Sequence, residues 1–282
     1  KITQHSDILL IALVIIVLGL MIVPLPTPIV DTLIGMNMML SFLMLMMAMY
    51  VKTALEFSVF PTMLLFTTLF RVGLNITTTR LILLQADAGE IIFTFGEFAV
   101  GGNFVVGAVV FVILTIVQFL VISKGAERVA EVGARFTLDA MPGKQMSIDA
   151  DLRAGVIDQA EAQARRNNVQ LESKMYGAMD GAMKFVKGDC IAGMIVALVN
   201  IVGGTIIGVS QNGMSAGQAL QTYGILTIGD GLVSQIPSLL VSISAGVLIT
   251  RSSDTKADVG AQVGKQFFDQ PRALKMAGIL VA

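Results

Sequence analysis

The ten residues from Arg71 to Arg80 constrain this chain more than any other feature. The segment reads Arg-Val-Gly-Leu-Asn-Ile-Thr-Thr-Thr-Arg and lies between an apolar run that starts at Phe57 and a second apolar patch at 81–84. Polar and cationic side chains are costly at membrane depth and persist there only if they face a protein interior or a wet path. The alternative, a helix that ends at Arg71 and a loop that starts at Arg80, leaves apolar pieces too short to span a bilayer. The segment therefore predicts a membrane protein in which Arg71, Asn75 and Arg80 line a polar interior.

Composition favours the same class. The 282 residues are 55% hydrophobic and 14% charged, with a mean hydropathy of +0.80, whereas soluble domains carry about 25% charged residues. A net charge of -1 indicates no nucleic-acid partner. The single Cys190 and the single His5 leave no zinc cluster and no thiol- or histidine-based catalytic set. Lys144 follows Gly143, but the pair lacks the Ser/Thr and upstream glycine of a phosphate-binding loop. We expect no enzyme, no metal and no cofactor.

Charge-free stretches predict the spans of an all-α integral membrane protein, a polytopic helical bundle. Six complete spans are expected, in 8–23, 32–51, 57–84, 98–123, 190–210 and 231–250. A seventh starts near Ala273, but the sequence stops before the roughly 20 residues that a span needs. We therefore expect this span to be truncated and a further domain to be missing. The segments 88–100 and 214–229 are expected to form short interfacial or re-entrant helices.

Basic residues orient these spans. Loops 24–28, 85–103 and 211–232 contain no Lys or Arg, whereas the loops between them carry Lys52, ten basic residues in 124–188, and four more in 251–272. By the positive-inside rule the N-terminus and the basic loops are cytoplasmic. The chain is thus divided into spans one to four (1–123), a cytoplasmic insertion (124–188), spans five and six (189–250), a cytoplasmic loop (251–272) and the start of a seventh span (273–282).

The insertion 124–188 is expected to be a compact helical module. It holds ten basic and nine acidic residues, so it is close to neutral. The segment 158–166 has strong helix formers, with acidic residues at its start and arginines at its end, which suits the helix dipole. The Met141-Pro-Gly143 sequence predicts a turn, and 149–152 is expected to open another.

Small residues recur at four-residue spacing in two places. Gly204 and Gly208 form one stripe, and Ser238, Ser242 and Gly246 form the other. Such stripes let helices approach closely. Packing within one subunit is the simpler interpretation, and packing between subunits of a ring is the alternative.

The separation of the two arginines makes a local prediction. Arg71 and Arg80 are nine residues apart, which is about two and a half turns of an α-helix. On one straight helix they would face opposite sides, and exposure of either to lipid costs about 2.5–3.5 kcal/mol. We therefore predict a helix break between Gly73 and Thr79.

Three blocks of the sequence resemble the large export-gate family of type III secretion, which serves flagella and virulence injectisomes. The blocks are 71–84, 134–151 and 176–189. They are long and specific, and the resemblance extends over essentially the whole chain. It implies eight spans followed by a large soluble cytoplasmic domain, so the eighth span and that domain would be absent here.

The resemblance also implies a function. Such proteins lie in the bacterial inner membrane and form a homo-oligomeric ring, a nonamer, together with other export-apparatus membrane proteins. The soluble domain would receive exported proteins, their chaperones and the ATPase complex. The membrane part would couple proton flow to polypeptide export. The Met-rich second span favours an injectisome over a flagellar system.

The resemblance points to Asp149 as the leading proton-linked residue. Weaker candidates are Lys144, Asp139, Asp189, Arg71 and Arg80. Partial burial or the like charge of Asp151 would favour protonated Asp149, whereas a nearby Lys144 would favour the carboxylate. From its spacing alone Asp149 is better explained as a helix N-cap or a solvated loop charge, and the resemblance favours a proton switch.

Two other classes of protein remain open. An ion-coupled transporter or channel for small solutes would also place arginine and asparagine in the membrane, although the sequence has no second copy of the 71–80 block. A passive scaffold ring that only docks other subunits fits the composition as well. An oligomeric state of a large ring would favour the export gate, whereas a monomer or dimer would favour the solute carrier. Proton flux in liposomes would separate the gate from the scaffold.

Overall fold

The computed structural model describes residues 6–251 and, after them, 260, 264–265, 268–272, 275–276 and 279. Within this part of the chain the structure is helical and contains no strand. The helices are α1 (Ser6–Ile22), α2 (Thr27–Tyr50), the short η1 (Ala54–Phe57), α3 (Phe60–Gln85), α4 (Glu90–Val100), α5 (Phe104–Val117), the π-helical turn η2 (Gln118–Ser123), α6 (Lys124–Arg153), α7 (Gln159–Ser210) and α8 (Ala216–Ile249).

Five helical segments are long and apolar enough to cross a membrane. They are 27–50, 54–85, 104–153, 159–210 and 216–249. The first helix, α1, has 17 residues, which is the lower limit of a spanning helix. The predicted all-α bundle of apolar helices is thus confirmed. The seventh span lies largely outside the described residues, so the number of spans stays a prediction.

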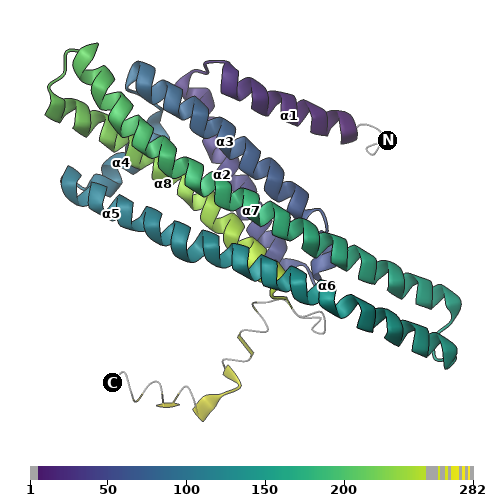
Figure 1. The fold of residues 1–282 in the computed structure, drawn as a ribbon. Helices are drawn as coiled ribbons and strands as arrows, with labels where there is room; N and C mark the ends of the chain where they lie inside the picture. The colour runs from purple at the N-terminus through teal and green to yellow at the C-terminus, as the bar shows by residue number, and fades with distance from the viewer. Residues whose placement is uncertain are drawn as a thin grey trace.

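The bundle is built around α8, which contacts α2, α3, α4, α5, α6 and α7 (Figure 1). Glycines let α4 lie directly against it. A Cβ atom on Gly229 would lie 1.9 Å from the carbonyl oxygen of Ile92, and one on Gly96 would lie 2.3 Å from that of Ile225. At these positions two helix backbones approach more closely than any side chain allows.

The predicted basic loops lie at one end of the bundle. Arg251, directly after α8, donates from Nε to the carbonyl of Lys52 (3.0 Å) and from Nη1 to that of Ala48 (3.3 Å). Helix α7 also contacts η1 at this end of the bundle. The first helix, α1, runs parallel to α3, because Val17 lies beside Gly73 and Ile22 beside Arg80. The N-terminal end of α1 therefore lies at the same end of the bundle as η1 and the N-terminal end of α3. This arrangement agrees with the predicted topology, while the side of the membrane is untested.

The insertion is a helical hairpin. Helix α6 and the first half of α7 pack against each other and extend beyond the other helices, at the lower right of Figure 1. Ile148, Ile157 and Ala162 form a small apolar core at the tip. Asp158 caps α7, because its Oδ1 accepts from the backbone N–H of Glu161 (2.7 Å). Continuous helices run through both predicted boundaries of the insertion, so the division into domains stays a prediction.

The predicted helix break between Gly73 and Thr79 is wrong. Helix α3 is continuous from 60 to 85. The reason is that α3 has protein neighbours on several sides, with α1 on one and α7 on another. Two arginines on opposite faces can therefore both reach protein partners without a break.

The predicted turns at 141–143 and 149–152 are also wrong, because α6 runs through both. Pro142 lacks an N–H, which leaves the carbonyl of Leu138 without its helical partner. Leu138 is 44% exposed, so this carbonyl can be hydrated and the helix continues. Of the two short outer helices, α4 is present, whereas the second is wrong as predicted, because residues 216–229 form the first part of the long helix α8.

Candidate functional site

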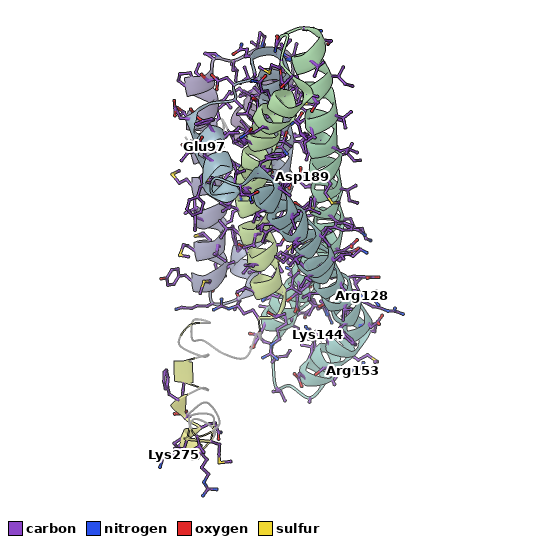
Figure 2. The ribbon with its side chains drawn as sticks, turned by 90° about the vertical axis from the view of Figure 1, so that its left-hand side faces the viewer. Glu97, Arg128, Lys144, Arg153, Asp189 and Lys275 are labelled. Atoms are coloured by element: carbon purple, nitrogen blue, oxygen red, sulfur yellow. The ribbon has the colours of Figure 1, made fainter. Side chains whose placement is uncertain are left out.

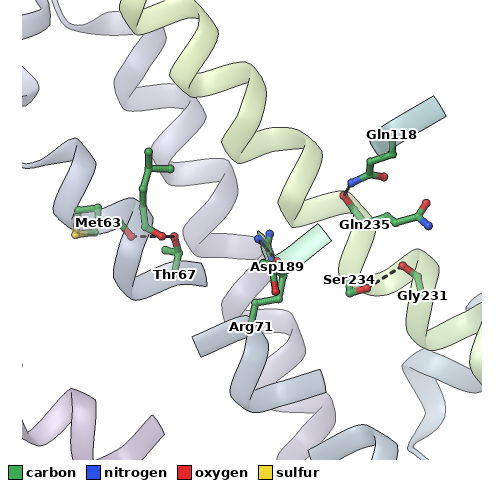
Figure 3. A network of polar contacts seen from close by, with 9 residues as sticks. Met63, Thr67, Arg71, Gln118, Asp189, Gly231, Ser234 and Gln235 are labelled. Atoms are coloured by element: carbon green, nitrogen blue, oxygen red, sulfur yellow. Dashed lines mark hydrogen bonds and ion pairs between the residues drawn. The ribbon is translucent and has the colours of Figure 1, made fainter. Parts of the chain in front are cut away.

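A buried ion pair joins α3 to α7 in the interior of the bundle. Arg71 donates from Nε to Oδ2 of Asp189 (2.6 Å), and its Nη2 contacts the same oxygen (Figure 3). The two side chains are 4% and 5% exposed. The sequence places them 118 residues apart, so only the fold brings them together. The prediction that Arg71 faces a polar interior is consistent with this geometry.

The ion pair is not fully satisfied by protein. Asp189 Oδ1 is buried and has no hydrogen-bonding partner among the described groups, and Arg71 Nη2 has only its ion-pair contact with Asp189 Oδ2. Both side chains line a cavity of about 40 Å³ between α3, α5, α7 and α8. A water molecule needs about 10–15 Å³ of such volume and two to four polar partners. The cavity therefore has the size and the polar lining for a small cluster of waters.

Irregular helix geometry borders the same cavity. Gln118 opens the π-helical turn η2 and donates from Nε2 to the carbonyl of Gln235 (3.1 Å), while Gln235 donates to Thr115 Oγ1 (2.8 Å). Pro237, two residues after Gln235, has no N–H and so interrupts the hydrogen bonds of α8. Single π-turns inside helices are frequent at functional sites, and here Gln118, the first residue of the turn, lines the same cavity as the charged pair; Figure 3 shows Gln118 with its partner Gln235.

A second, smaller cavity of about 10 Å³ adjoins the first. Arg71, Asn75 and Ser234 line both cavities, and Asp230 lines the second. Asp230 is 7% exposed and forms none of the described ion pairs. Sequence reasoning missed this residue because it treated it as a boundary between spans. The available signal was that Asp230 is the single charged residue between Asp189 and Arg251.

Arg80 has a different surrounding from Arg71. It is half-buried and donates to the carbonyl oxygens of Ile22 (2.7 Å) and Met21 (3.2 Å) at the end of α1. Thr77 donates to the next carbonyl, that of Leu20 (2.7 Å). Side chains of α3 thus satisfy the last carbonyls of α1, which an isolated helix leaves free.

The other predicted charged residues lie on the hairpin, away from the buried pair. Asp149 accepts from Arg166 (2.5 Å) and Lys144 donates to Glu172 (2.8 Å), so each pairs with α7. Asp139 lies 4.0 Å from Arg135 with 71% of its side chain exposed. Figure 2 shows Lys144 low on the hairpin with Arg128 and Arg153, well below Asp189. The structure therefore separates the predicted coupling residues into two groups.

The small-residue stripes behave differently from each other. A Cβ on Gly204 would lie 2.3 Å from Tyr223 of α8, and one on Gly208 would lie 2.8 Å from Ala219, so the first stripe packs within the subunit. Ser242 is buried with no partner for its hydroxyl among the described groups. A Cβ on Gly246 would meet no described atom within 4 Å.

The fold and the site define a class of protein, a helical membrane bundle with a charged interior. The chain belongs to the FHIPEP family, which it matches over residues 17–282.

Three relatives show how similar the chain is to known proteins. Low calcium response locus protein D of Yersinia pestis is 58% identical over 282 residues, covering 100% of this chain and 40% of the relative. Protein MxiA of Shigella flexneri is 53% identical over 280 residues, 99% of this chain and 41% of that protein. Hypersensitivity response secretion protein HrcV of Ralstonia nicotianae is 56% identical over 275 residues, covering 96% of this chain and 40% of that protein.

The chain therefore spans about 40% of the length of these relatives. No solved structure matches it. The resemblance to the export-gate family of type III secretion, drawn from three sequence blocks, is confirmed.

Proposed function

We propose that this chain is the membrane part of an export gate of a bacterial type III secretion system, and that it couples a proton gradient to polypeptide export. The observation that carries the proposal is the charged pair between Arg71 and Asp189, buried beside a polar cavity inside a bundle of apolar helices. Ionisable groups in such a place mark ion or proton pathways. The family membership supplies the export context.

The proposal includes a location and partners. The protein lies in the inner membrane, with its N-terminus and the α6–α7 hairpin in the cytoplasm. Its subunits form a nonameric ring with other export-apparatus membrane proteins. The part of the protein beyond this chain receives exported proteins, chaperones and the ATPase complex. The proposal assigns Gly246 to contacts between subunits, since a Cβ atom on it would meet no described atom within 4 Å in one subunit. Ser242 is buried within the subunit and is assigned to helix packing there.

Asp149 is the proposed switch on the hairpin. Its carboxylate is paired with Arg166 of α7, and both side chains are about two-fifths exposed, so a proton can reach it from water. Protonation removes the charge that Arg166 pairs with. The hairpin has three other α6–α7 ion pairs, Lys144–Glu172, Arg165–Asp151 and Lys187–Glu127. Loss of the Asp149–Arg166 ion pair, one of four between α6 and α7, would shift the packing of these two helices without separating them.

Export measured in cells that carry single variants tests this role. Asp149→Asn fixes the neutral form and should reduce export severely, whereas Asp149→Glu keeps a titratable group and should reduce it less. Asp151→Asn is the matched control, since Asp151 pairs with Arg165 on the same two arms and should have little effect. The ring mass in mild detergent should be unchanged in all three. Normal export by Asp149→Asn, or its failure to assemble, would refute the switch.

The same measurements decide between this function and its alternatives. Proton flux in liposomes that vanishes in Asp189→Asn supports a gate, and flux that never exceeds protein-free liposomes supports a passive scaffold. A purified full-length protein that is only monomeric or dimeric supports a small-solute carrier.

A further inference from the structure

Asp230 occupies an unusual position for a carboxyl group. It lies within α8, the central helix of the bundle, and is 7% exposed. Thr78 of α3 lines the same small cavity as Asp230. No described ion pair includes Asp230. A buried carboxylate without a paired cation is costly, and the group escapes that cost by taking up a proton.

The hydrogen bonds around Thr78 are consistent with a protonated Asp230. Thr78 Oγ1 lies 3.1 Å from the carbonyl oxygen of Asn75, to which it donates. A hydroxyl has one hydrogen, so Thr78, while it donates to Asn75, has none for Asp230 in the same cavity and could only accept from it. A hydrogen bond between the two in this arrangement would require a proton on the carboxyl group. If Asp230 loses its proton, Thr78 can turn its hydrogen towards the carboxylate instead. Thr78 thus offers Asp230 a hydrogen-bonding partner in either protonation state, as an acceptor for the protonated carboxyl group or as a donor to the carboxylate.

The cavity beside Asp230 suits a proton better than a metal cation. Its volume is about 10 Å³, which is at the lower limit for one water molecule, so a hydrated cation does not fit. Arg71 lines the same cavity, and its positive charge opposes a bare cation.

Other titratable groups on the helices around Asp230 lie elsewhere. Asp31 of α2 caps α4, Glu90 and Glu97 of α4 are exposed, and Asp189 of α7 pairs with Arg71. Helix α5 carries no charged residue.

The two cavities share a wall. Arg71, Asn75 and Ser234 line both, with Asp189 on one side and Asp230 on the other. Arg71 contacts Asp189 through Nε and Nη2, and it also lines the cavity of Asp230. An ionised Asp230 would therefore compete with Asp189 for the same guanidinium.

We infer that Asp230 is a proton-binding site inside the bundle, and that it exchanges its proton with Asp189 across the polar wall formed by Arg71, Asn75 and Ser234. The carboxyl group binds the proton, and no other bond forms or breaks. Its use in export rests on the proposed function.

Infrared difference spectroscopy of the full-length protein in lipid bilayers tests the site directly. The wild type should show the carbonyl band of a buried, protonated carboxyl group at neutral pH, shifted in D₂O and unchanged when Na⁺ replaces K⁺. Asp230→Asn should lack this band, while Asp139→Asn, which removes an exposed carboxyl, should keep it. If Asp230→Asn does not fold, Asp230→Glu should move the band instead of removing it.

Three results would overturn the inference: a band that persists in Asp230→Asn, no such band in the wild type, or a band that Na⁺ abolishes. The last would identify a cation site. Export by Asp230→Asn separates this inference from the proposed function. If the band is lost as expected but export is normal, the proton site stands and its role in coupling is wrong.

Discussion

Replacing Asp189 by Asn should destabilise the bundle by about 3–5 kcal/mol, because the substitution leaves a guanidinium buried without its counter-ion. Both side chains are at most 5% exposed, so bulk solvent does not screen the lost charge. No described carboxylate other than Asp189 lies within ion-pairing distance of Arg71. Arg71→Gln should cost a similar amount, since it leaves the carboxylate unpaired.

The double variant Arg71→Gln, Asp189→Asn distinguishes an ion pair from two independent contacts. With both charges removed, the two amides can hydrogen-bond to each other, and the expected cost is about 1–2 kcal/mol. The two single effects should therefore be strongly non-additive. Unfolding by SDS titration in mixed micelles, followed by circular dichroism, measures the four proteins of this double-mutant cycle: the wild type, the two single variants and the double variant.

Asp139→Asn is the matched control for the cycle. Its side chain is 71% exposed and lies 4.0 Å from Arg135, and exposed pairs of this kind contribute about 0–1 kcal/mol. Additive single effects, or a cost below about 1 kcal/mol for Asp189→Asn, would show that the interior is wet enough to solvate the unpaired arginine. That result would refute the reasoning.

Two further predictions concern the packing of α4. Gly229→Ala places a methyl group 1.9 Å from the carbonyl oxygen of Ile92 and should cost about 1–3 kcal/mol in thermal unfolding. Gly217→Ala on the same helix, where a Cβ atom would meet no described atom within 4 Å, should not destabilise; equal effects would contradict the close α4–α8 approach. Asp31→Ala removes the acceptor for the backbone N–H groups of Glu90 (3.1 Å) and Ile91 (3.2 Å) and should cost about 0.5–2 kcal/mol. Faster hydrogen exchange confined to the start of α4 is the expected signature, and unchanged exchange there would show that Asp31 is not its cap.

The bundle could be predicted from the sequence because a bilayer leaves few alternatives. Backbone groups in lipid must be satisfied internally, so a charge-free apolar stretch becomes a helix. Five of the six complete predicted spans overlap helices long and apolar enough to cross a membrane, and the first overlaps α1. Basic residues predicted which loops share an end, and Arg251 does lie beside Lys52.

Tertiary contacts decided what local signals could not. The polar segment 71–80 and Pro142 both suggested interruptions, yet α3 and α6 run through them. In α3 the polar side chains form hydrogen bonds with neighbouring helices. In α6 the carbonyl of Leu138, which lacks the N–H of Pro142 as its partner, is at an exposed position and can bind water. The partner of Arg71 could not be predicted, because a separation of 118 residues carries no local signal. Asp230 was missed for a different reason: a single charge in an apolar stretch was interpreted as a boundary, although α8 continues through it.

The last prediction follows from the different surroundings of the two arginines in one motif. Helix α1 has no basic residue in its last turn, and α3 supplies one, since Arg80 donates to the carbonyls of Met21 and Ile22. A cation at a helix C-terminus also interacts favourably with the helix dipole.

Arg80→Gln should therefore release the end of α1 while leaving the ion pair of Arg71 intact. Hydrogen bonds to a charged donor contribute about 1.5–3 kcal/mol each, and the partial exposure of Arg80 places the loss for both near the lower end of that range. Because about 1.4 kcal/mol corresponds to a tenfold change in an equilibrium constant, amides of the last turn of α1 should exchange roughly tenfold faster. Arg80→Lys should show a smaller effect, since it keeps the charge. Exchange that accelerates equally in α8, or not at all in α1, would show that Arg80 does not hold α1 to the bundle.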